Sequence, residues 1–356
     1  MKIVTVVGAR PQFIKAAAVS RILKKSAHEI LLHTGQHYDN NLSQVFFDEL
    51  DIPQPNYNLG VGSENHGTQT GEMLAKTEEV LINEQPDWVL VYGDTNSTLA
   101  GALAAAKLNI KVAHVEAGLR SYNRRMPEEI NRVLTDHVSD LLFCPSEVAV
   151  DNLRKEGITG GVVVVGDVMM DSLTYAANKA GTQSQILDDL KIAPGEYYLS
   201  TVHRAENTDE PQNLENILKA LGALDLQVIF PIHPRTLQAI KNHHLEHYLD
   251  KPNLKVTKPL GYLDMVHLEK SAKMILTDSG GIQKEAYWLK VPCITLREET
   301  EWIETVQSGW NVLVGGNPEL IVDTVRNFQV PQEHPELYGS GQAGEKIVEH
   351  LVHVKA

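Results

Sequence analysis

Residues 88–98 read WVLVYGDTNST, an apolar run followed by one glycine, an aspartate and a group of small polar residues. The run is short and rich in β-branched and aromatic residues, which predicts a buried strand. The small polar residues after Asp94 are typical of a helix N-terminus. A strand, a glycine turn and a helix in this order form the repeating unit of a parallel α/β sheet. The stretch therefore predicts that fold class, with Asp94 just beyond the carboxyl end of a strand.

Two later segments present carboxylates in a similar way. Residues 112–120 (VAHVEAGLR) predict a strand that ends at Glu116, and residues 126–132 (MPEEINR) predict a helix with proline in its first turn. On that helix, Glu128 and Arg132 lie four residues apart and share a face. Because the carboxyl ends of parallel strands meet at one edge of a sheet, where ligands bind, we expect the three carboxylates to converge there.

The composition limits the possible partners. A formal net charge of −14 argues against nucleic acid and against an anionic membrane surface, because both require a basic face. No apolar segment is long enough for a signal peptide or a membrane span. The two cysteines, Cys144 and Cys293, lie far apart without metal-binding spacing, as expected for reduced thiols in a cytoplasmic protein. We therefore predict a cytoplasmic enzyme without a metal site.

The chain length and the pattern of elements predict two domains. A chain of 356 residues is long for one hydrophobic core. Apolar strands alternate with helical segments, and a second alternation begins at residues 197–201, which predicts two doubly wound, Rossmann-like parallel sheets. We assign residues 1–170 to the first domain, residues 171–340 to the second, and residues 341–356 to a last helix that packs back toward the first domain.

Three segments predict binding of an anion. Residues 8–15 (GARPQFIK) pass from a strand through glycine into a helix start, and residues 201–207 (TVHRAEN) follow a strand directly. Helix N-termini favour anions, and cationic side chains add full charges. The cations of these two segments are Arg10, Lys15, His203 and Arg204. A purely structural loop and a surface pair remain the alternatives for them.

The third segment, residues 277–286 (TDSGGIQKEA), places Ser279, Gly280 and Gly281 between an apolar strand and a helix. Glycines allow close backbone approach, so this helix start suits a diphosphate. Glu285 could then accept hydrogen bonds from the hydroxyls of a ribose. The alternative is an ordinary capped helix with Glu285 in solvent.

Together these segments resemble the non-hydrolysing UDP-N-acetylglucosamine 2-epimerases over nearly the whole chain. The matching motifs are GARP (8–11) with Lys15, GQH (35–37), GDT (93–95), HVEAGLR (114–120), PEEINR (127–132), HRAEN (203–207) and DSGGIQKE (278–285). The resemblance implies a GT-B-type fold, with two Rossmann-like domains facing each other across a cleft. It also implies a UDP-sugar substrate, no cofactor, a homodimer and a role in polysaccharide biosynthesis.

The same resemblance implies a reaction and roles for residues. The family inverts C2 of the sugar by eliminating UDP to give a glycal and then adding UDP back. Asp94, Glu116 and Glu128 match its catalytic carboxylates, without an assignment of acid and base. Arg132 would orient Glu128 and neighbouring groups, and Lys15 and His203 match diphosphate contacts. The positions that would hold UDP are Arg10, Arg204, Ser279, Gly280, Gly281 and Glu285.

Two segments depart from the pattern of many bacterial members. Residues 301–304 are Glu-Trp-Ile-Glu instead of Glu-Arg-Pro-Glu, and Tyr38 replaces an arginine. Both changes resemble the branch that acts on UDP-2,3-diacetamido-2,3-dideoxyglucuronate, so this sugar is the alternative substrate. The second change also argues against allosteric activation by substrate. More distant alternatives are a hydrolysing epimerase and a glycosyltransferase of the same fold.

Overall fold

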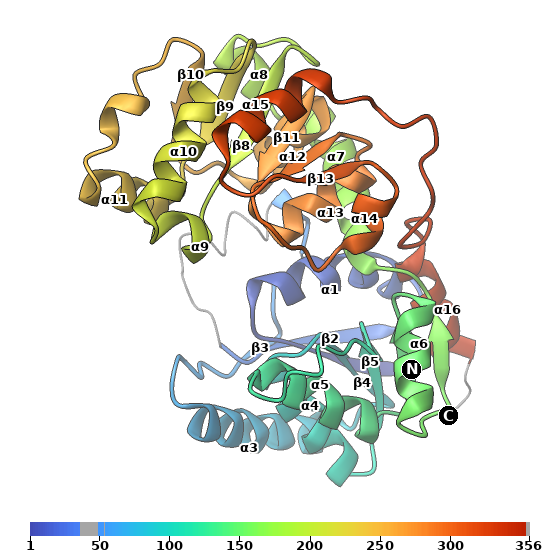
Figure 1. Ribbon diagram of the computed structural model, residues 1–356. Helices are drawn as coiled ribbons and strands as arrows, with labels where there is room; N and C mark the ends of the chain where they lie inside the picture. The colour runs from blue at the N-terminus through green and yellow to red at the C-terminus, as the bar shows by residue number, and fades with distance from the viewer. Residues whose placement is uncertain (36–48, 53, 354–356) are drawn as a thin grey trace. The chain divides into compact units, whose positions relative to one another are not determined.

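The computed structural model describes residues 1–35, 49–52 and 54–353 (Figure 1). The chain divides into two compact units, one formed by Met1–Tyr175 with Tyr338–Ala356 and one by Ala176–Leu337. The domain boundaries expected after residues 170 and 340 lie close to these. Gln36 and His37 of the GQH motif, and Tyr38, lie outside the described residues.

The first unit is built on a parallel sheet with the strand order β3-β2-β1-β4-β5-β6-β7. The strands are β1 (Lys2–Val7), β2 (His28–His33), β3 (Tyr57–Asn58), β4 (Trp88–Tyr92), β5 (Lys111–Val115), β6 (Leu141–Cys144) and β7 (Val162–Val164). The central strands are buried along their length, as the apolar runs predict.

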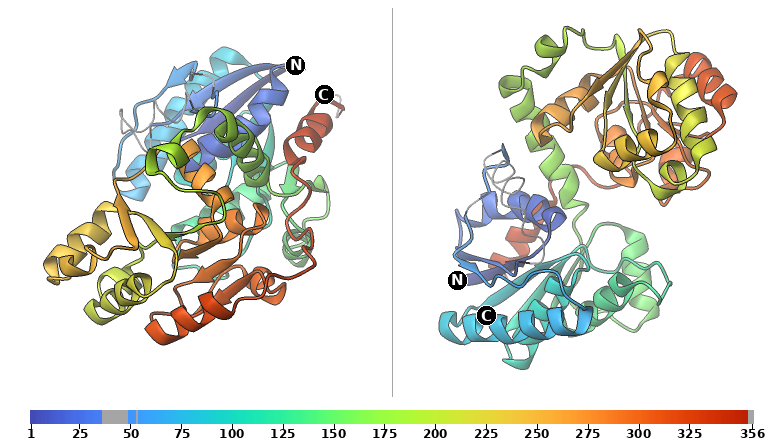
Figure 2. Two further views of the ribbon diagram at one scale, coloured as in Figure 1. Left: turned by 90° about the horizontal axis from the view of Figure 1, so that it is seen from above. Right: turned by 90° about the vertical axis from the view of Figure 1, so that its left-hand side faces the viewer.

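Helices cover both faces of this sheet (Figures 1 and 2). They are α1 (Arg10–Leu23), α3 (His66–Glu84), α4 (Asn96–Lys107), α5 (Pro127–Val138), α6 (Glu147–Lys155), the start of α7 (Val168–Gln183) and α16 (Ala343–His353). The C-terminal helix α16 packs against α1, since a methyl group added at Gly344 would lie 3.1 Å from the carbonyl oxygen of Ala18. Asp171 accepts hydrogen bonds from the first backbone amides of α16, at Ala343 and Gly344.

The second unit has a parallel sheet with the order β10-β9-β8-β11-β12-β13. Its strands are β8 (Tyr197–Thr201), β9 (Gln227–Pro231), β10 (Leu254–Thr257), β11 (Met274–Thr277), β12 (Cys293–Thr295) and β13 (Asn311–Leu313). Its helices are α8 (Ile186–Leu190), α9 (Ala205–Thr208), α10 (Pro211–Gly222), α11 (Pro234–Asn242), η1 (Glu246–Tyr248), α12 (Tyr262–Ser271), α13 (Gly280–Trp288), α14 (Ile303–Gln307) and α15 (Pro318–Asn327). Separate apolar clusters fill the two faces of the sheet.

Both sheets reverse their strand order at one place. In the first unit this place lies between β1 and β4, and in the second between β8 and β11. Ligands of doubly wound sheets bind outside the carboxyl ends of the strands at such a reversal. The predicted site residues follow these four strands or the adjacent β5. The prediction of two doubly wound α/β sheets is confirmed.

Candidate active site

Two ion pairs lie at the carboxyl ends of β4 and β5 in the first unit. Lys15 on α1 pairs with Glu116, and Arg132 on α5 pairs with Asp94. A methyl group added at Gly93 would lie 3.2 Å from Oε2 of Glu116 and 3.5 Å from Nζ of Lys15. Gly93 therefore lets the turn that carries Asp94 lie directly against the Lys15–Glu116 pair. The structure thus brings together four of the predicted residues.

The ion pair of Lys15 and Glu116 is largely enclosed. The two side chains are 13% and 19% exposed. Burial by itself lowers the pKa of Lys15, but the Glu116 carboxylate outweighs it, with smaller contributions from Asp167 and Asp94, so the pKa is raised overall. The ammonium group of Lys15 therefore stays protonated beside these three carboxylates.

The backbone at Glu116 adopts a conformation that is uncommon for a residue with a side chain. Its φ is 73°, in the left-handed region. The amides of Glu116 and Ala117 both donate to the carbonyl oxygen of Phe143, each at 3.1 Å, and this holds the turn. Strained backbone of this kind collects at functional sites. Here the left-handed conformation at Glu116 directs its carboxylate toward Lys15.

A second residue that holds Arg132 is Glu129, which is not among the predicted site residues. Its carboxylate is buried, lies 3.3 Å from Nη1 of Arg132, and accepts hydrogen bonds from Ser121 and from the amide of Tyr122. Burial raises the pKa of Glu129, but these hydrogen bonds and Arg132 outweigh it and lower the pKa overall. Glu129 is therefore an ionised anchor for both α5 and the preceding loop.

Glu128 is the third predicted carboxylate. It is exposed, and no hydrogen bond or ion pair within the described part of the chain involves it. Arg132 pairs with Asp94 and Glu129, so it orients groups that neighbour Glu128, and its orientation of Glu128 itself stays a prediction. Glu128 nevertheless lies on the helix that borders Asp94, since Asn131 donates to the Asp94 carbonyl oxygen at 2.9 Å.

The turn after β1 also differs from the expectation. The amides of Gly8 and Ala9 donate to Oε1 of Gln12, at 2.8 and 3.0 Å, and are not left for an anion. Gln12 also donates to the carbonyl oxygen of Tyr92 at 2.7 Å, so it links this turn to the end of β4. The backbone of Arg10 begins α1, and its side chain is not among the described groups.

In the second unit, a buried carboxylate organises the loop after β8. Asp278 accepts hydrogen bonds from the amides of His203 and Arg204, at 3.0 and 2.9 Å, and from the Asn207 side chain at 3.1 Å. Burial lowers the pKa of His203, and His233 and nearby arginines add to this effect against the opposing charge of Asp278. His203 is therefore neutral at neutral pH.

The start of α13 combines the features of an anion site. Ser279 is the N-cap, and a methyl group added at Gly280 would lie 3.7 Å from Nη2 of Arg204. Trp302 donates from its indole nitrogen to the Gly280 carbonyl oxygen at 2.8 Å. The dipole of α13 and the Arg204 guanidinium thus both favour an anion at this helix start. Further along α13, Glu285 acts on Glu269 of α12. Burial, and then the charge of Glu285, raise the pKa of Glu269 well above its usual range.

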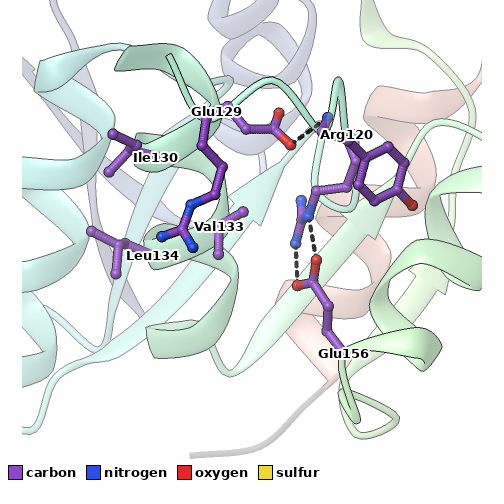
Figure 3. A pocket seen from close by; sticks show the side chains of 8 residues that line it. Arg120, Glu129, Ile130, Val133, Leu134 and Glu156 are labelled. Atoms are coloured by element: carbon purple, nitrogen blue, oxygen red, sulfur yellow. Dashed lines mark hydrogen bonds and ion pairs between the residues drawn. The ribbon is translucent and has the colours of Figure 1, made fainter. Parts of the chain in front are cut away.

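A surface hollow of about 370 Å³ lies on the other side of α5. Figure 3 shows its wall of Ile130, Val133 and Leu134, with Arg120 facing Glu156 through two hydrogen bonds. Arg120 and Glu156 are paired with each other, and Glu129, which holds Arg132, also lines the hollow. In the residues that the structure describes, no group of three or more His, Cys, Asp or Glu is arranged to hold a metal ion. Within the same residues, no helix is long and apolar enough to cross a bilayer.

The profile of the family described as UDP-N-acetylglucosamine 2-epimerase matches residues 21–352. The chain belongs to this family. A UDP-N-acetylglucosamine 2-epimerase homolog of Methanococcus maripaludis is 58% identical over 99% of both chains. A UDP-2,3-diacetamido-2,3-dideoxy-D-glucuronate 2-epimerase of Pseudomonas aeruginosa is 48% identical over 99% of both chains.

A solved structure supports the same assignment. The UDP-N-acetylglucosamine 2-epimerase of Methanocaldococcus jannaschii, in complex with UDP-N-acetylglucosamine and UDP, is 46% identical, with a TM-score of 0.82 over 99% of this chain and 100% of that one. The resemblance to the 2-epimerase family stated from the motifs is confirmed.

Proposed function

We propose that this protein inverts C2 of UDP-N-acetylglucosamine without a cofactor, giving UDP-N-acetylmannosamine. The observation that carries the proposal is the pair of cation-bound carboxylates, Asp94 and Glu116, on either side of Gly93. Clustered carboxylates next to fixed cations can differ in proton affinity, which lets one accept a proton while another donates. A family member with UDP-N-acetylglucosamine and UDP bound supports the substrate.

The chemistry is an elimination followed by an addition. A carboxylate takes the proton from C2, a double bond forms between C1 and C2, and the C1–O bond electrons leave with UDP. A second carboxylate then delivers a proton to the opposite face of C2, and UDP adds back at C1. We assign proton transfer to Asp94, Glu116 and Glu128 as a group, because the C2–H bond is barely acidic and needs a positioned base.

The residues that hold the carboxylates and the UDP have separate tasks in this proposal. Lys15 and Arg132 hold Glu116 and Asp94 in place, and Lys15 also offers its charge to the diphosphate. His203, Arg204 and the α13 start, with Ser279, Gly280 and Gly281, bind the departing UDP and stabilise its charge. Arg10 and Glu285 would contact the rest of the nucleotide.

Incubation with UDP-N-acetylglucosamine in D2O tests the proposal. We expect deuterium at C2 and formation of the manno epimer, followed by proton NMR. Asp94→Asn, Glu116→Gln and Glu128→Gln should each slow exchange by about 10²- to 10⁴-fold, the usual contribution of a positioned acid or base. Exchange that survives all three changes would refute the assignment of the carboxylates, and its absence in the unaltered protein would refute the reaction.

A second candidate substrate is UDP-2,3-diacetamido-2,3-dideoxyglucuronate, which the relative 48% identical to this chain names. Trp302 lies at the position where many members of the family have arginine, and this difference also favours the diacetamido sugar. Side-by-side turnover of the two sugars separates the candidates. Steady release of free UDP would instead indicate a hydrolysing epimerase, and turnover that requires an acceptor would indicate a glycosyltransferase.

We also propose a homodimer. Exposed apolar side chains at Tyr122, Ile130 and Leu134 border the hollow on α5, and such groups mark interaction surfaces. Light scattering coupled to gel filtration measures the mass. A dimer that Leu134→Glu converts to a monomer supports this face, and a monomeric unaltered protein contradicts the proposal.

A cytoplasmic location is a further proposal. Cys144 and Cys293 are both free and buried, and burial raises the pKa of each thiol to about 12. Such thiols suit a reducing compartment. Fractionation of cells that produce the protein tests the location.

A further inference from the structure

His114 lies within β5, two residues before Glu116, and its side chain is completely buried. Its Nδ1 is 2.7 Å from Oδ1 of Asp136, and its Nε2 is 2.8 Å from the carbonyl oxygen of Gly93. A carbonyl oxygen can only accept a hydrogen bond, and so can an ionised carboxylate. Both ring nitrogens therefore face acceptors.

Counting protons fixes how many protons His114 and Asp136 hold together. A neutral imidazole carries one N–H, so a neutral ring beside an ionised Asp136 would leave one buried acceptor facing a lone pair. The pair must therefore hold two protons, either as an imidazolium with a carboxylate or as a neutral ring with a protonated acid. In both cases the proton on Nε2 is donated to the Gly93 carbonyl oxygen.

The remaining partners of Asp136 favour the ionised form of its carboxyl group. Arg120 donates to its Oδ2 at 2.7 Å, and the amide of Gly118 donates at 3.1 Å. Burial raises the pKa of Asp136, but His114 and Arg120 outweigh it, so the pKa is lowered overall. Arg120 in turn binds Glu156 through two hydrogen bonds of 2.7 Å (Figure 3). Hydrogen bonds thus run from Glu156 in the surface hollow through Arg120, Asp136 and His114 to the Gly93 turn.

Gly93 is the point at which this network meets the carboxylate cluster. Its carbonyl group precedes Asp94 directly, and its amide donates to the carbonyl oxygen of Val115 at 3.0 Å. A methyl group added at Gly93 would lie against the carboxylate of Glu116 and the ammonium of Lys15. A rotation of the Gly93 peptide would therefore move Asp94 relative to Glu116.

We infer that His114 is a positioning residue for the reaction, which fixes the Gly93 peptide through Nε2–H and so sets Asp94 against the Lys15–Glu116 pair. The inference rests on the proposed function and adds to it a residue that does not touch the substrate. It predicts that the bond to Gly93 matters for turnover and that the bond to Asp136 matters mainly for folding.

Two substitutions separate these bonds. In His114→Gln the side-chain amide nitrogen lies as many bonds from Cβ as Nε2 does, so it can still donate to Gly93. In His114→Asn the amide nitrogen corresponds to Nδ1 and can reach only Asp136. Each variant removes one of the two hydrogen bonds. Tyr197→Phe is the matched control, because it removes a buried 2.6 Å hydrogen bond to the Leu268 carbonyl oxygen in the second unit.

We expect kcat of His114→Asn to fall by about 10- to 100-fold, the effect of a slightly misplaced catalytic group. His114→Gln should recover at least tenfold of this loss, and Tyr197→Phe should keep the kcat of the unaltered protein. UDP affinity, measured by calorimetry, should stay within about threefold, since an equilibrium change below about 0.7 kcal/mol has that size. An unaltered kcat in His114→Asn, or an equal loss in both variants, overturns the inference.

A second measurement detects the proton on Nε2 directly in the unaltered protein and uses His114→Gln only to assign the ring signal. In a two-bond 1H–15N spectrum with labelled histidine, the signal that disappears in His114→Gln must show a proton on Nε2. A bare Nε2 overturns the inference. Failure of the unaltered protein to exchange C2 in D2O would refute the proposed function instead, and the ring signal would still report on the hydrogen bond.

Discussion

Replacement of Gly93 by alanine tests how closely the two ion pairs depend on the turn between them. Gly93 has a φ of 63°, and the added methyl group would lie 3.2 Å from Oε2 of Glu116 and 3.5 Å from Nζ of Lys15. The first distance is shorter than ordinary van der Waals contact. Since the Glu116 backbone is held by two hydrogen bonds to Phe143, its side chain has to move away from the turn.

The expected effects on stability and on catalysis differ in size. A left-handed conformation costs a residue with a side chain roughly 1–2 kcal/mol. For a unit of this size, each kcal/mol lowers the melting temperature by about 2–4 °C. Displacement of Glu116 by a fraction of an ångström to 1 Å should lower kcat by about 10- to 100-fold. Catalysis should therefore suffer far more than folding.

Gly157→Ala supplies the matched control. Gly157 has a φ of 82° in the same unit, and a methyl group there would meet no atom within 4 Å. This variant should lose a similar few degrees of melting temperature and keep its kcat. Turnover at saturating UDP-sugar and calorimetric melting are measured for both. A folded Gly93→Ala protein with normal kcat would refute the view that the turn positions Glu116.

Three further predictions concern the anchors of the site. Arg132→Lys should lower kcat by about tenfold, because lysine cannot contact Asp94 and Glu129 together in the same fork geometry; equal rates would contradict this. The lowered pKa of Glu129 stabilises the fold above the pH at which a free glutamate titrates, and this contribution is lost as pH falls toward the lowered pKa. The difference in melting temperature between the unaltered protein and Glu129→Gln should therefore shrink in acid, and a constant difference would contradict this. Asp278→Asn should cost about 1–3 kcal/mol of stability and weaken UDP binding, since fewer acceptor sites remain for its three donors. Scanning calorimetry measures the stability and titration calorimetry the UDP affinity, and unchanged values of both would contradict this.

The sequence is sufficient to place Asp94 and Glu116. Each follows a buried strand directly, and in a parallel sheet the end of a strand determines where the chain emerges. The same holds for His203 and Ser279 in the second unit. Apolar runs and glycine turns therefore predict both the fold and the edge of each sheet that carries the chemistry.

Side-chain partners on helices were harder to predict. The motif of residues 126–132 marks a helix start but does not determine how the helix is rotated about its axis. Neighbouring residues point about 100° apart, so the rotation decides whether Glu128 or Glu129 faces the interior and the loop that precedes the helix. In the structure the buried Glu129 takes this position, because three hydrogen-bond donors from residues 121–122 satisfy its carboxylate.

Two buried polar residues were missed for a related reason. His114 interrupts an apolar strand, and Gln12 lies in the first turn of α1, and both were signals of a buried hydrogen-bonding role. A sequence does not specify which backbone carbonyl or amide such a group will meet, since that depends on the pairing of distant strands. The contacts with Gly93 and Tyr92 therefore became visible only in the folded chain.

The first unit is discontinuous, because its last helix, α16, comes from the end of the chain and packs on α1 near its beginning. During synthesis on the ribosome, the sheet that carries Asp94 and Glu116 emerges long before this helix does. The nascent first unit must therefore wait with part of α1 uncovered until residues 343–353 leave the exit tunnel. A protein truncated before α16 should be prone to aggregation for the same reason, although every proposed catalytic residue would still be present.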